Sequence, residues 1–240
     1  MSKLFVFAHQ DDEVAIATRI AREVAAGARV VCAFLTDGGA PQVRDAESRA
    51  ALQELGVHEL IFVGLPDGKL VEHLEEAYRA IEAIDAGEVM TLAWEGGHQD
   101  HDAAHLVALA LAIARGVRCL EFPLYHGKGL WGPFFHVMKP LHGGQRRRLS
   151  AREVWRRTRL CWRYPSQWRS WIGLCWPTLL RWNEVVCDAS AERVLHPPHE
   201  GRLLYERRFR FPRERFFAAA GPFIEKRIVE RTAVHRLARD

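Results

Sequence analysis

The fold is decided early in the chain by residues 4–27, which read LFVFAHQDDEVAIATRIAREVAAG. An apolar run over 4–8 comes first, a polar stretch follows it, and apolar residues then recur every three or four positions until Gly27. The run is typical of a buried strand, and the later spacing is typical of an amphipathic helix that ends at a glycine. We therefore expect a strand, a loop and a helix, in that order.

The same unit of strand, loop and helix recurs along the first half of the chain. Strands that alternate with helices imply βαβ crossovers, which build a mostly parallel sheet with helices on both faces. The sequence therefore predicts an α/β fold, a Rossmann-like three-layer sandwich. Ligands of such sheets bind beyond the carboxyl ends of the strands. The expected strands are 4–8, 28–35, 60–63, 88–94 and 117–122, and the expected helices are 11–26, 45–55, 71–84 and 102–114.

The charge is distributed unevenly along the chain. The 240 residues have a net charge of +4, and 48% of them are hydrophobic, enough for a core without disulfide or metal staples. Residues 1–145 contain 12 Lys and Arg against 20 Asp and Glu, whereas residues 146–240 contain 22 against 10. We therefore expect a Rossmann-like metal-binding core over 1–145 and a basic C-terminal extension over 146–240, packed on the core within the same domain.

Features that indicate export or a membrane span are missing from the sequence. No apolar stretch approaches the length of about eighteen residues that a spanning helix needs, and the run at 4–8 is too short for a signal peptide. The five cysteines include no CxxC pair, which favours buried thiols in a reducing compartment. These observations predict a cytoplasmic protein.

Ionisable side chains concentrate in two of the loops that follow strands. Residues 9–13 read HQDDE, and residues 96–101 read GGHQDH. A histidine at a strand tip and a carboxylate three residues later can converge on one divalent ion when a further histidine arrives from a neighbouring loop. Aspartates often cap helix starts, but capping requires neither a preceding histidine nor a second His-x-Asp-His cluster. The two loops therefore predict a divalent-metal site.

These motifs resemble those of the PIG-L/LmbE superfamily of zinc-dependent N-deacetylases. Residues 8–13, AHQDDE, are similar to the family's Ala-His-Pro-Asp-Asp-Glu, and residues 98–101, HQDH, to its His-Pro-Asp-His. Gln10 and Gln99 stand where the family usually has proline, which bears on the rigidity of each loop. Shorter similarities lie at 35–39, 44–47, 55–57, 65–68 and 164–167.

The resemblance implies a ligand set and a base. His9, Asp12 and His101 would bind a zinc ion, and Asp11 would be the general base. Zinc held by three protein ligands lowers the pKa of a bound water to about 7, which makes a nucleophile available at neutral pH.

Further roles follow for the second motif and for the substrate pocket. His98 is expected to stabilise the oxyanion or to protonate the leaving amine, with Asp100 orienting it. Arg44 and Asp67 are the positions that the resemblance assigns to contacts with the sugar. Three other polar residues are candidates for supporting the metal ligands: Glu13, Asp102 and His105.

The resulting hypothesis is a zinc-dependent hydrolase that removes the N-acetyl group from an N-acetylated amino sugar of the N-acetylglucosamine type. Another metal-dependent amidase acting on a sugar or thiol conjugate stays open. Two histidines and a carboxylate also describe the facial triad of Fe(II) oxygenases, although those usually occupy all-β folds. A catalytically idle relative that binds polyanions or membranes is the alternative from another class.

Residues 146–182 have an unusual composition: ten arginines, one acid, Glu153, and six of the eight tryptophans. Ser150 and Glu153 form a capping-box pattern, so an amphipathic helix packed on the sheet is one interpretation. Tryptophan and arginine also suit a phosphorylated or lipid-linked glycan or a peripheral membrane contact, whereas nucleic acid is disfavoured because no recognition motif accompanies the charge. Beyond this segment we expect strands near 184–187 and 203–211, a surface loop at 196–199 and a helix over 222–237.

Overall fold

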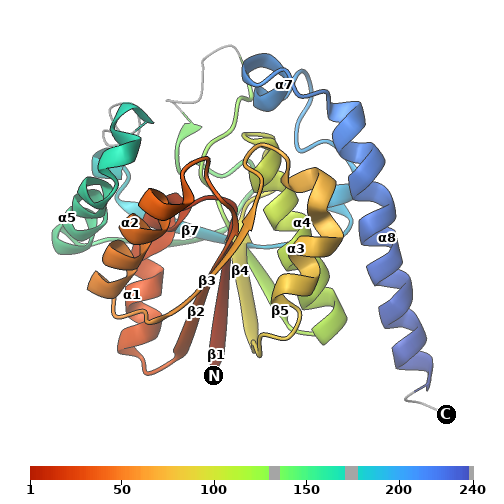
Figure 1. Cartoon of the computed structure of the whole chain (residues 1–240), viewed down its shortest axis with the longest axis horizontal. Helices are drawn as coiled ribbons and strands as arrows, with labels where there is room; N and C mark the ends of the chain where they lie inside the picture. Colours follow the sequence, from red (N-terminus) through yellow and green to blue (C-terminus); the bar gives the residue numbers. More distant parts are fainter. Residues whose placement is uncertain (130–135, 171–177, 238–240) are drawn as a thin grey trace.

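A sheet of seven strands runs through the middle of the molecule, and helices cover both of its faces (Figure 1). The computed structural model describes residues 1–129, 136–170 and 178–237, with side chains up to residue 227. The strands are β1 (Ser2–Phe7), β2 (Arg29–Thr36), β3 (Glu59–Leu65), β4 (Glu88–Leu92), β5 (Arg118–Phe122), β6 (Gln145–Arg148) and β7 (Asn183–Asp188).

The strand order is β3-β2-β1-β4-β5-β7-β6. The pairs among β1 to β5 are parallel, and β7 runs antiparallel to both β5 and β6. The predicted α/β fold with a mostly parallel sheet is therefore confirmed. The order reverses between β1 and β4, so the carboxyl ends of these two strands border the crevice in which such sheets bind ligands.

The helices form the two outer layers. In Figure 1, α1, α2 and α5 lie on one side of the sheet, and α3, α4 and α8 lie on the other. The α-helices are α1 (Ala17–Ala25), α2 (Pro41–Glu54), α3 (Leu74–Ile81), α4 (Gln99–Arg115), α5 (Ala151–Leu160), α7 (Leu204–Arg208) and α8 (Arg213–Leu237). Single 3₁₀ turns are η1 (Asp12–Ile16), η2 (Leu70–His73), η4 (Cys161–Arg163), η5 (Pro165–Gln167) and η6 (Arg193–Leu195).

The central strand β1 is apolar because it is covered on both faces. Leu4, Phe5, Val6 and Phe7 are at most 1% exposed. The ring of Phe7 stacks on that of Phe34 in β2, with 5.3 Å between centroids. Burial of this continuous apolar run is the main source of stability of a parallel strand, at roughly 25 cal/mol per Å² of apolar surface removed from water.

The first helix differs from the sequence expectation at its start. A helix was expected from residue 11, but η1 precedes α1, which begins at Ala17. The carboxylate of Asp12 accepts the backbone N–H groups of Ala8 and His9, at 3.1 and 2.8 Å. This side chain therefore holds the end of β1 instead of capping a regular helix, and the chain turns tightly where the first motif lies.

The C-terminal part shows one wrong expectation, one that is partly met and one that is confirmed. A strand was expected near 203–211, but this segment contains helix α7. The helix begins after the buried Leu203, and the backbone N–H of Leu203 donates to Glu206 Oε2 at 2.5 Å. The expected closing helix is α8, but it begins at Arg213 and contains Pro222. The strand expected near 184–187 is β7. The short basic strand β6 carries no apolar pattern that could have indicated it.

Residues 146–240 contact the preceding part through the sheet and through ion pairs. Strand β7 pairs with β5, and Glu184 of β7 accepts hydrogen bonds from Thr18 and Arg22 of α1. Across the other face, the ring of Phe216 in α8 lies 5.5 Å from that of Trp94. The boundary at residue 145 stays a prediction, since these contacts do not locate it.

Candidate metal centre and catalytic pocket

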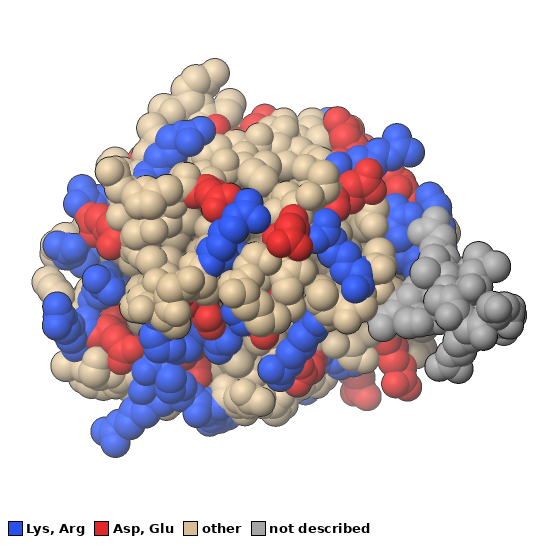
Figure 2. Space-filling model, turned by 90° about the horizontal axis from the view of Figure 1, so that it is seen from below, with Lys and Arg blue, Asp and Glu red and all other residues tan. Residues whose placement is uncertain are grey.

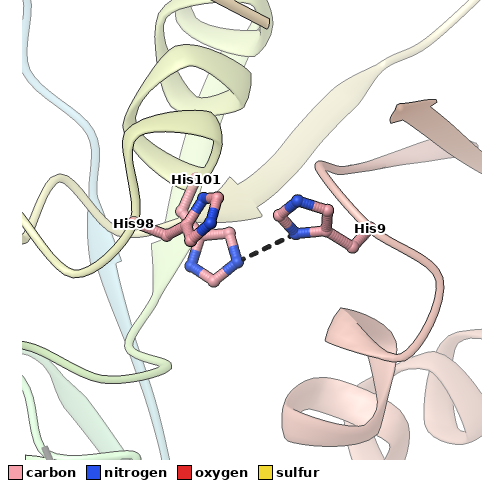
Figure 3. Close-up of side chains that lie close together, drawn as sticks. All are labelled: His9, His98 and His101. Carbon is pink, nitrogen blue, oxygen red and sulfur yellow. Dashed lines mark hydrogen bonds between the residues drawn. The ribbon is translucent and has the colours of Figure 1, made fainter. Parts of the chain in front are cut away.

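The two histidine-bearing loops meet at the carboxyl ends of β1 and β4. His9 directly follows Ala8 at the end of β1, and His98 is the N-cap of α4, which carries His101 in its first turn. Figure 3 shows the imidazoles of these three residues facing one another across the gap between the loop and the helix. The fold therefore assembles the two motifs at the reversal point of the sheet.

The three predicted ligands lie within reach of one another. The His9 Nδ1 atom is 3.2 Å from His101 Nε2, and the Asp12 carboxylate lies 3.3 Å from His101 Nε2 and 3.8 Å from His9 Nδ1. All three residues are buried. In tetrahedral zinc sites, bonds of about 2.0–2.2 Å place neighbouring donor atoms roughly 3.3 Å apart. The separation and the chemistry of these donors therefore fit a single small dication.

Polar contacts of the His9 Nε2 atom determine which ring nitrogen of His9 has a lone pair available for a metal. Its Nε2 atom donates to Asp67 Oδ1 at 2.9 Å and faces Asp100 Oδ2 at 3.3 Å. In the neutral ring the proton therefore sits on Nε2, and the lone pair of Nδ1 points at His101. Two facing imidazole nitrogens need a cation or a proton between them, and carboxylate partners of this kind are usual for metal-binding histidines.

The charges of the site favour a cation. Burial opposes ionisation of Asp12, but the imidazoles of His101 and His9 outweigh it and lower the pKa of Asp12 to about 2. The hydrogen bond from His9 lowers the pKa of Asp67, and Asp100 also has a lowered pKa despite its burial. Burial lowers the pKa of His9, but hydrogen bonds to Asp100 and Asp67 raise it well above its ordinary value. Three ionised carboxylates thus surround the imidazoles.

Two further groupings of donors overlap this one. Among the described residues, one set consists of His9, His98 and His101, whose ring nitrogens lie within 4.8 Å of one another. The other set consists of His9, Asp67 and Asp100, whose donor atoms lie within the same distance of one another. The geometry alone does not choose between these sets, so the assignment of His9, Asp12 and His101 as ligands stays a prediction.

His98 is oriented as a hydrogen-bond donor. Its Nδ1 atom accepts the backbone N–H of Asp100 at 3.1 Å, so in the neutral ring the proton sits on Nε2. Burial, and then the charges of His9 and His101, lower its pKa well below the ordinary value. The cationic form of His98 is therefore disfavoured, and a neutral N–H remains as the group that His98 can offer.

The side chain of Asp100 has a different partner from the one expected. Its carboxylate accepts the backbone N–H groups of Gly68 and Leu70, at 2.6 and 3.1 Å, and contacts His9. Only its backbone N–H orients His98. Asp100 therefore ties the loop after β3 to His9, an arrangement that the sequence spacing could not indicate.

Asp11 lies beside the candidate ligands in an unusual backbone conformation. Its φ of 119° is in the region that favours glycine, and its N–H donates to the buried Glu13 at 3.0 Å. Its carboxylate accepts a hydrogen bond from Arg44 at 2.9 Å. Burial raises the pKa of Asp11 to about 7, against the opposing charge of Arg44. A carboxylate with this pKa can take up a proton near neutral pH.

Arg44 and Asp67, the two residues expected to contact substrate, differ in how much of each side chain is exposed in the pocket. Asp67 is 41% exposed at its side chain and lines the pocket. Arg44 also lines the pocket but is buried, and it donates to the backbone carbonyls of Gly38 and Gln10 as well as to Asp11. Most of the guanidinium of Arg44 therefore serves to hold the first motif, whereas Asp67 has an open face.

Hydrogen bonds constrain the two loops at the glutamines that replace proline. The side-chain amide of Gln10 donates to Thr36 O at 3.2 Å and to Asp45 Oδ1 at 2.7 Å, and that of Gln99 donates to Gly68 O at 3.3 Å. Both side chains are buried. These bonds provide each loop with a fixed attachment that a proline ring could not make.

A pocket of about 200 Å³ opens at this centre. Three residues of its wall, Leu124, Tyr125 and Ser170, lie outside the sequence motifs, whereas Gln167 belongs to one of the similar stretches. Leu124 and Tyr125 follow β5, so the rule that ligands bind beyond strand ends could have found them. Ser170 has no such signal, because only the folded chain brings it to the pocket.

Two buried acids, Glu95 and Asp102, hold the loops after β4 and β5 through backbone hydrogen bonds. Glu95 accepts the N–H groups of Leu124 and Tyr125, each at 2.7 Å, and Asp102 accepts those of Glu95 and Gly96. A Cβ atom at Gly97 would overlap the carbonyl oxygen of Tyr125. The backbones of the loops after β4 and β5 are thus in close contact.

His105 forms a hydrogen bond with the end of β4, away from the candidate metal ligands. Its Nδ1 lies 2.8 Å from the carbonyl of Leu92. This residue therefore supports the end of β4.

A family model matches this part of the chain. Residues 4–112 match PIG-L, described as GlcNAc-PI de-N-acetylase. A search of the curated proteins gave no match.

Solved structures share the fold at low sequence identity. A deacetylase of teicoplanin biosynthesis has a TM-score of 0.64 and 18% identity, over 79% of this chain and 99% of that one. The N,N'-diacetylchitobiose deacetylase of Pyrococcus horikoshii has a TM-score of 0.57 and 13% identity, over 78% and 83%. The 4-carboxy-2-hydroxymuconate hydratase of Pseudomonas putida has a TM-score of 0.57 and 16% identity, over 79% and 96%. At these identities the likeness shows the fold alone.

Proposed function

Because residues 4–112 are a PIG-L family segment within the fold of the LmbE-type deacetylases, we propose that this chain is a zinc-dependent N-deacetylase. Its substrate would be an N-acetylated amino sugar of the N-acetylglucosamine type within a glycoconjugate. The observation that carries the proposal is the convergence of His9, Asp12 and His101, within 3.2–3.8 Å of one another, beside Asp11.

Each residue of the site would have a separate role in amide hydrolysis. His9, Asp12 and His101 would hold the zinc, which would supply a Lewis acid and a water of lowered pKa. Asp11 would take the proton from the attacking water, since its carboxylate lines the pocket and has a pKa of about 7. The Nε2–H of His98 would donate to the carbonyl oxygen of the acetyl group as negative charge develops on it.

The pocket is suited to a polar ligand of modest size. Its volume of about 200 Å³ and its mixed lining offer apolar surface at Leu124 and Tyr125 and hydrogen-bonding groups at Asp67, Gln167 and Ser170. An acetyl methyl group would lie against the apolar part, and sugar hydroxyls would face the polar part. Asp67 would thus bind substrate while keeping its bond to His9.

The direct test is acetate release from a panel of N-acetylhexosamine conjugates by purified, zinc-loaded protein. Acetate formed in equal amount to free amine, and absent after chelation, is the expected result. Activity restored by Fe(II) with oxygen but not by zinc, or amide cleavage confined to conjugates without an amino sugar, would contradict the proposal.

Replacing His98 by alanine should reduce kcat by roughly 10² to 10³-fold, because one preorganised donor to the oxyanion is lost. Zinc content should stay at the wild-type value, since the lone pair of His98 Nδ1 already accepts the backbone N–H of Asp100. Steady-state kinetics and metal analysis check this, with the exposed His58→Ala as control. Loss of zinc from His98→Ala would instead make His98 a ligand.

Asp100→Asn should lower the affinity for zinc by about 10- to 100-fold. An amide cannot accept from His9, Gly68 and Leu70 at once as the carboxylate does, so His9 loses part of its orientation. Competition against a chelator measures the affinity, and the exposed Asp85→Asn serves as the matched control. An unchanged dissociation constant would show that Asp67 alone orients His9.

A further inference from the structure

One side of α5 and of the turn that follows it exposes arginine and tryptophan together. The positions recur every three or four residues, so their side chains share one face of the helix. The opposite face is buried through Val154, Thr158 and Leu160. We define the Arg/Trp face by its exposed members, which are Arg152, Trp155, Arg156, Arg159, Trp162 and Arg163.

The tryptophans of this face are not used for packing the core. Trp155 is 54% exposed and Trp162 is 67% exposed, and their rings meet edge to face with 5.9 Å between centroids. Exposing two large rings side by side leaves apolar surface in water at a cost. Tryptophan rings are favoured at the interface between an apolar layer and water, as at the headgroup level of a bilayer.

The charge of the face is positive. Arg159 and Arg163 both pair with Glu54 of α2, whereas Arg152 and Arg156 have no acidic partner within the described ranges. Figure 2 shows Lys and Arg side chains along the left edge of the molecule, on the side where α5 lies in Figure 1. An anionic partner would complement this face.

A second exposed pair of tryptophan and arginine follows the Arg/Trp face in the chain, next to the pocket. Trp168 is 56% exposed, and the guanidinium of Arg169 stacks on its ring at 5.4 Å. The residues on either side of this pair, Gln167 and Ser170, line the pocket. A ligand surface that contacts the Arg/Trp face would thus reach the rim of the candidate active site.

We propose that the Arg/Trp face docks the protein on an anionic lipid bilayer. Arginines attract the negative headgroups, and the two tryptophan rings enter the interfacial layer, which together supply the two signals that stable peripheral binding needs. No helix in the described part of the chain is long and apolar enough to cross a membrane. Docking would bring the pocket rim at Gln167 and Ser170 close to the headgroups.

The test is sedimentation of the full chain with vesicles of phosphatidylcholine alone or mixed with phosphatidylglycerol. Binding is expected to the mixed vesicles only, and salt should weaken it. Arg152→Gln with Arg156→Gln should lower the partition coefficient by roughly tenfold or more. Trp155→Ala with Trp162→Ala should lower it in the same direction, because the apolar signal is lost.

The matched control is Arg79→Gln with Arg115→Gln, on the opposite side of the sheet, which should bind as the wild type does. Circular dichroism establishes that each variant is folded. Acetate release from a water-soluble conjugate should be unaffected by the variants of the face, so failure of docking is separable from failure of the proposed activity.

Three outcomes would overturn the proposal. The first is an absence of wild-type binding to anionic vesicles, and the second is an equal loss in the control variant. The third is salt-sensitive binding of an oligonucleotide by this face without binding to vesicles, which would assign it to nucleic acid.

Discussion

Replacing His101 by alanine should give a folded protein that retains no zinc and has lost acetate release by more than about 10³-fold. The reason is that the metal supplies several kcal/mol of transition-state stabilisation, and two remaining ligands cannot hold it. Within the described residues, the imidazole of His101 has polar contacts with His9 and Asp12 alone, so its removal should disturb the loops little. Metal analysis and kinetics check this.

The control for this variant is His73→Ala, a partly exposed histidine in η2 that lies away from the pocket. It should keep both zinc and activity. A His101→Ala protein that still binds one zinc per chain and turns over at the wild-type rate would remove His101 from the ligand set and favour one of the other donor groupings.

The second large effect is expected from Asp11→Asn, with a fall in kcat of about 10² to 10⁴-fold and no loss of zinc. The amide oxygen can still accept the hydrogen bond from Arg44, so the loop should keep its conformation, but an amide cannot take up a proton. The rate of the wild type should fall as pH is lowered through the pKa of Asp11, because the protonated carboxyl is no base.

Rate profiles of both proteins against pH measure this expectation. In Asp11→Asn the acid limb should be missing, while the exposed Asp85→Asn should keep it. A variant that retains the wild-type rate and acid limb would assign the base to another group. Loss of zinc would show that Asp11 is needed for metal binding.

The sequence predicted the parts of this molecule whose signals are local. The apolar run over 4–8 is bounded by polar residues, and it is a buried strand. His9 and His101 could be placed together because each follows a strand of a parallel sheet. The capping box of Ser150 and Glu153 is also confirmed, since both of its hydrogen bonds are made within three residues.

What could not be predicted depends on residues far apart in the chain. Asp100 is the second residue of α4, yet the partners of its carboxylate lie in the segment after β3. Ser170 reaches the pocket only through the path of the chain after α5. Residues 203–211 alternate as a strand would, but burial of Leu203, Leu204 and Tyr205 is consecutive, as a helix end allows.

The contact between the loops after β4 and β5 has a consequence for protein engineering. Since any side chain at Gly97 would displace the backbone at Tyr125, libraries that randomise residues 95–101 should consist mainly of misfolded members. Gln167 and Ser170 also line the pocket, and both side chains are at least partly exposed to solvent. Substitutions meant to reshape the pocket should therefore begin at these two residues.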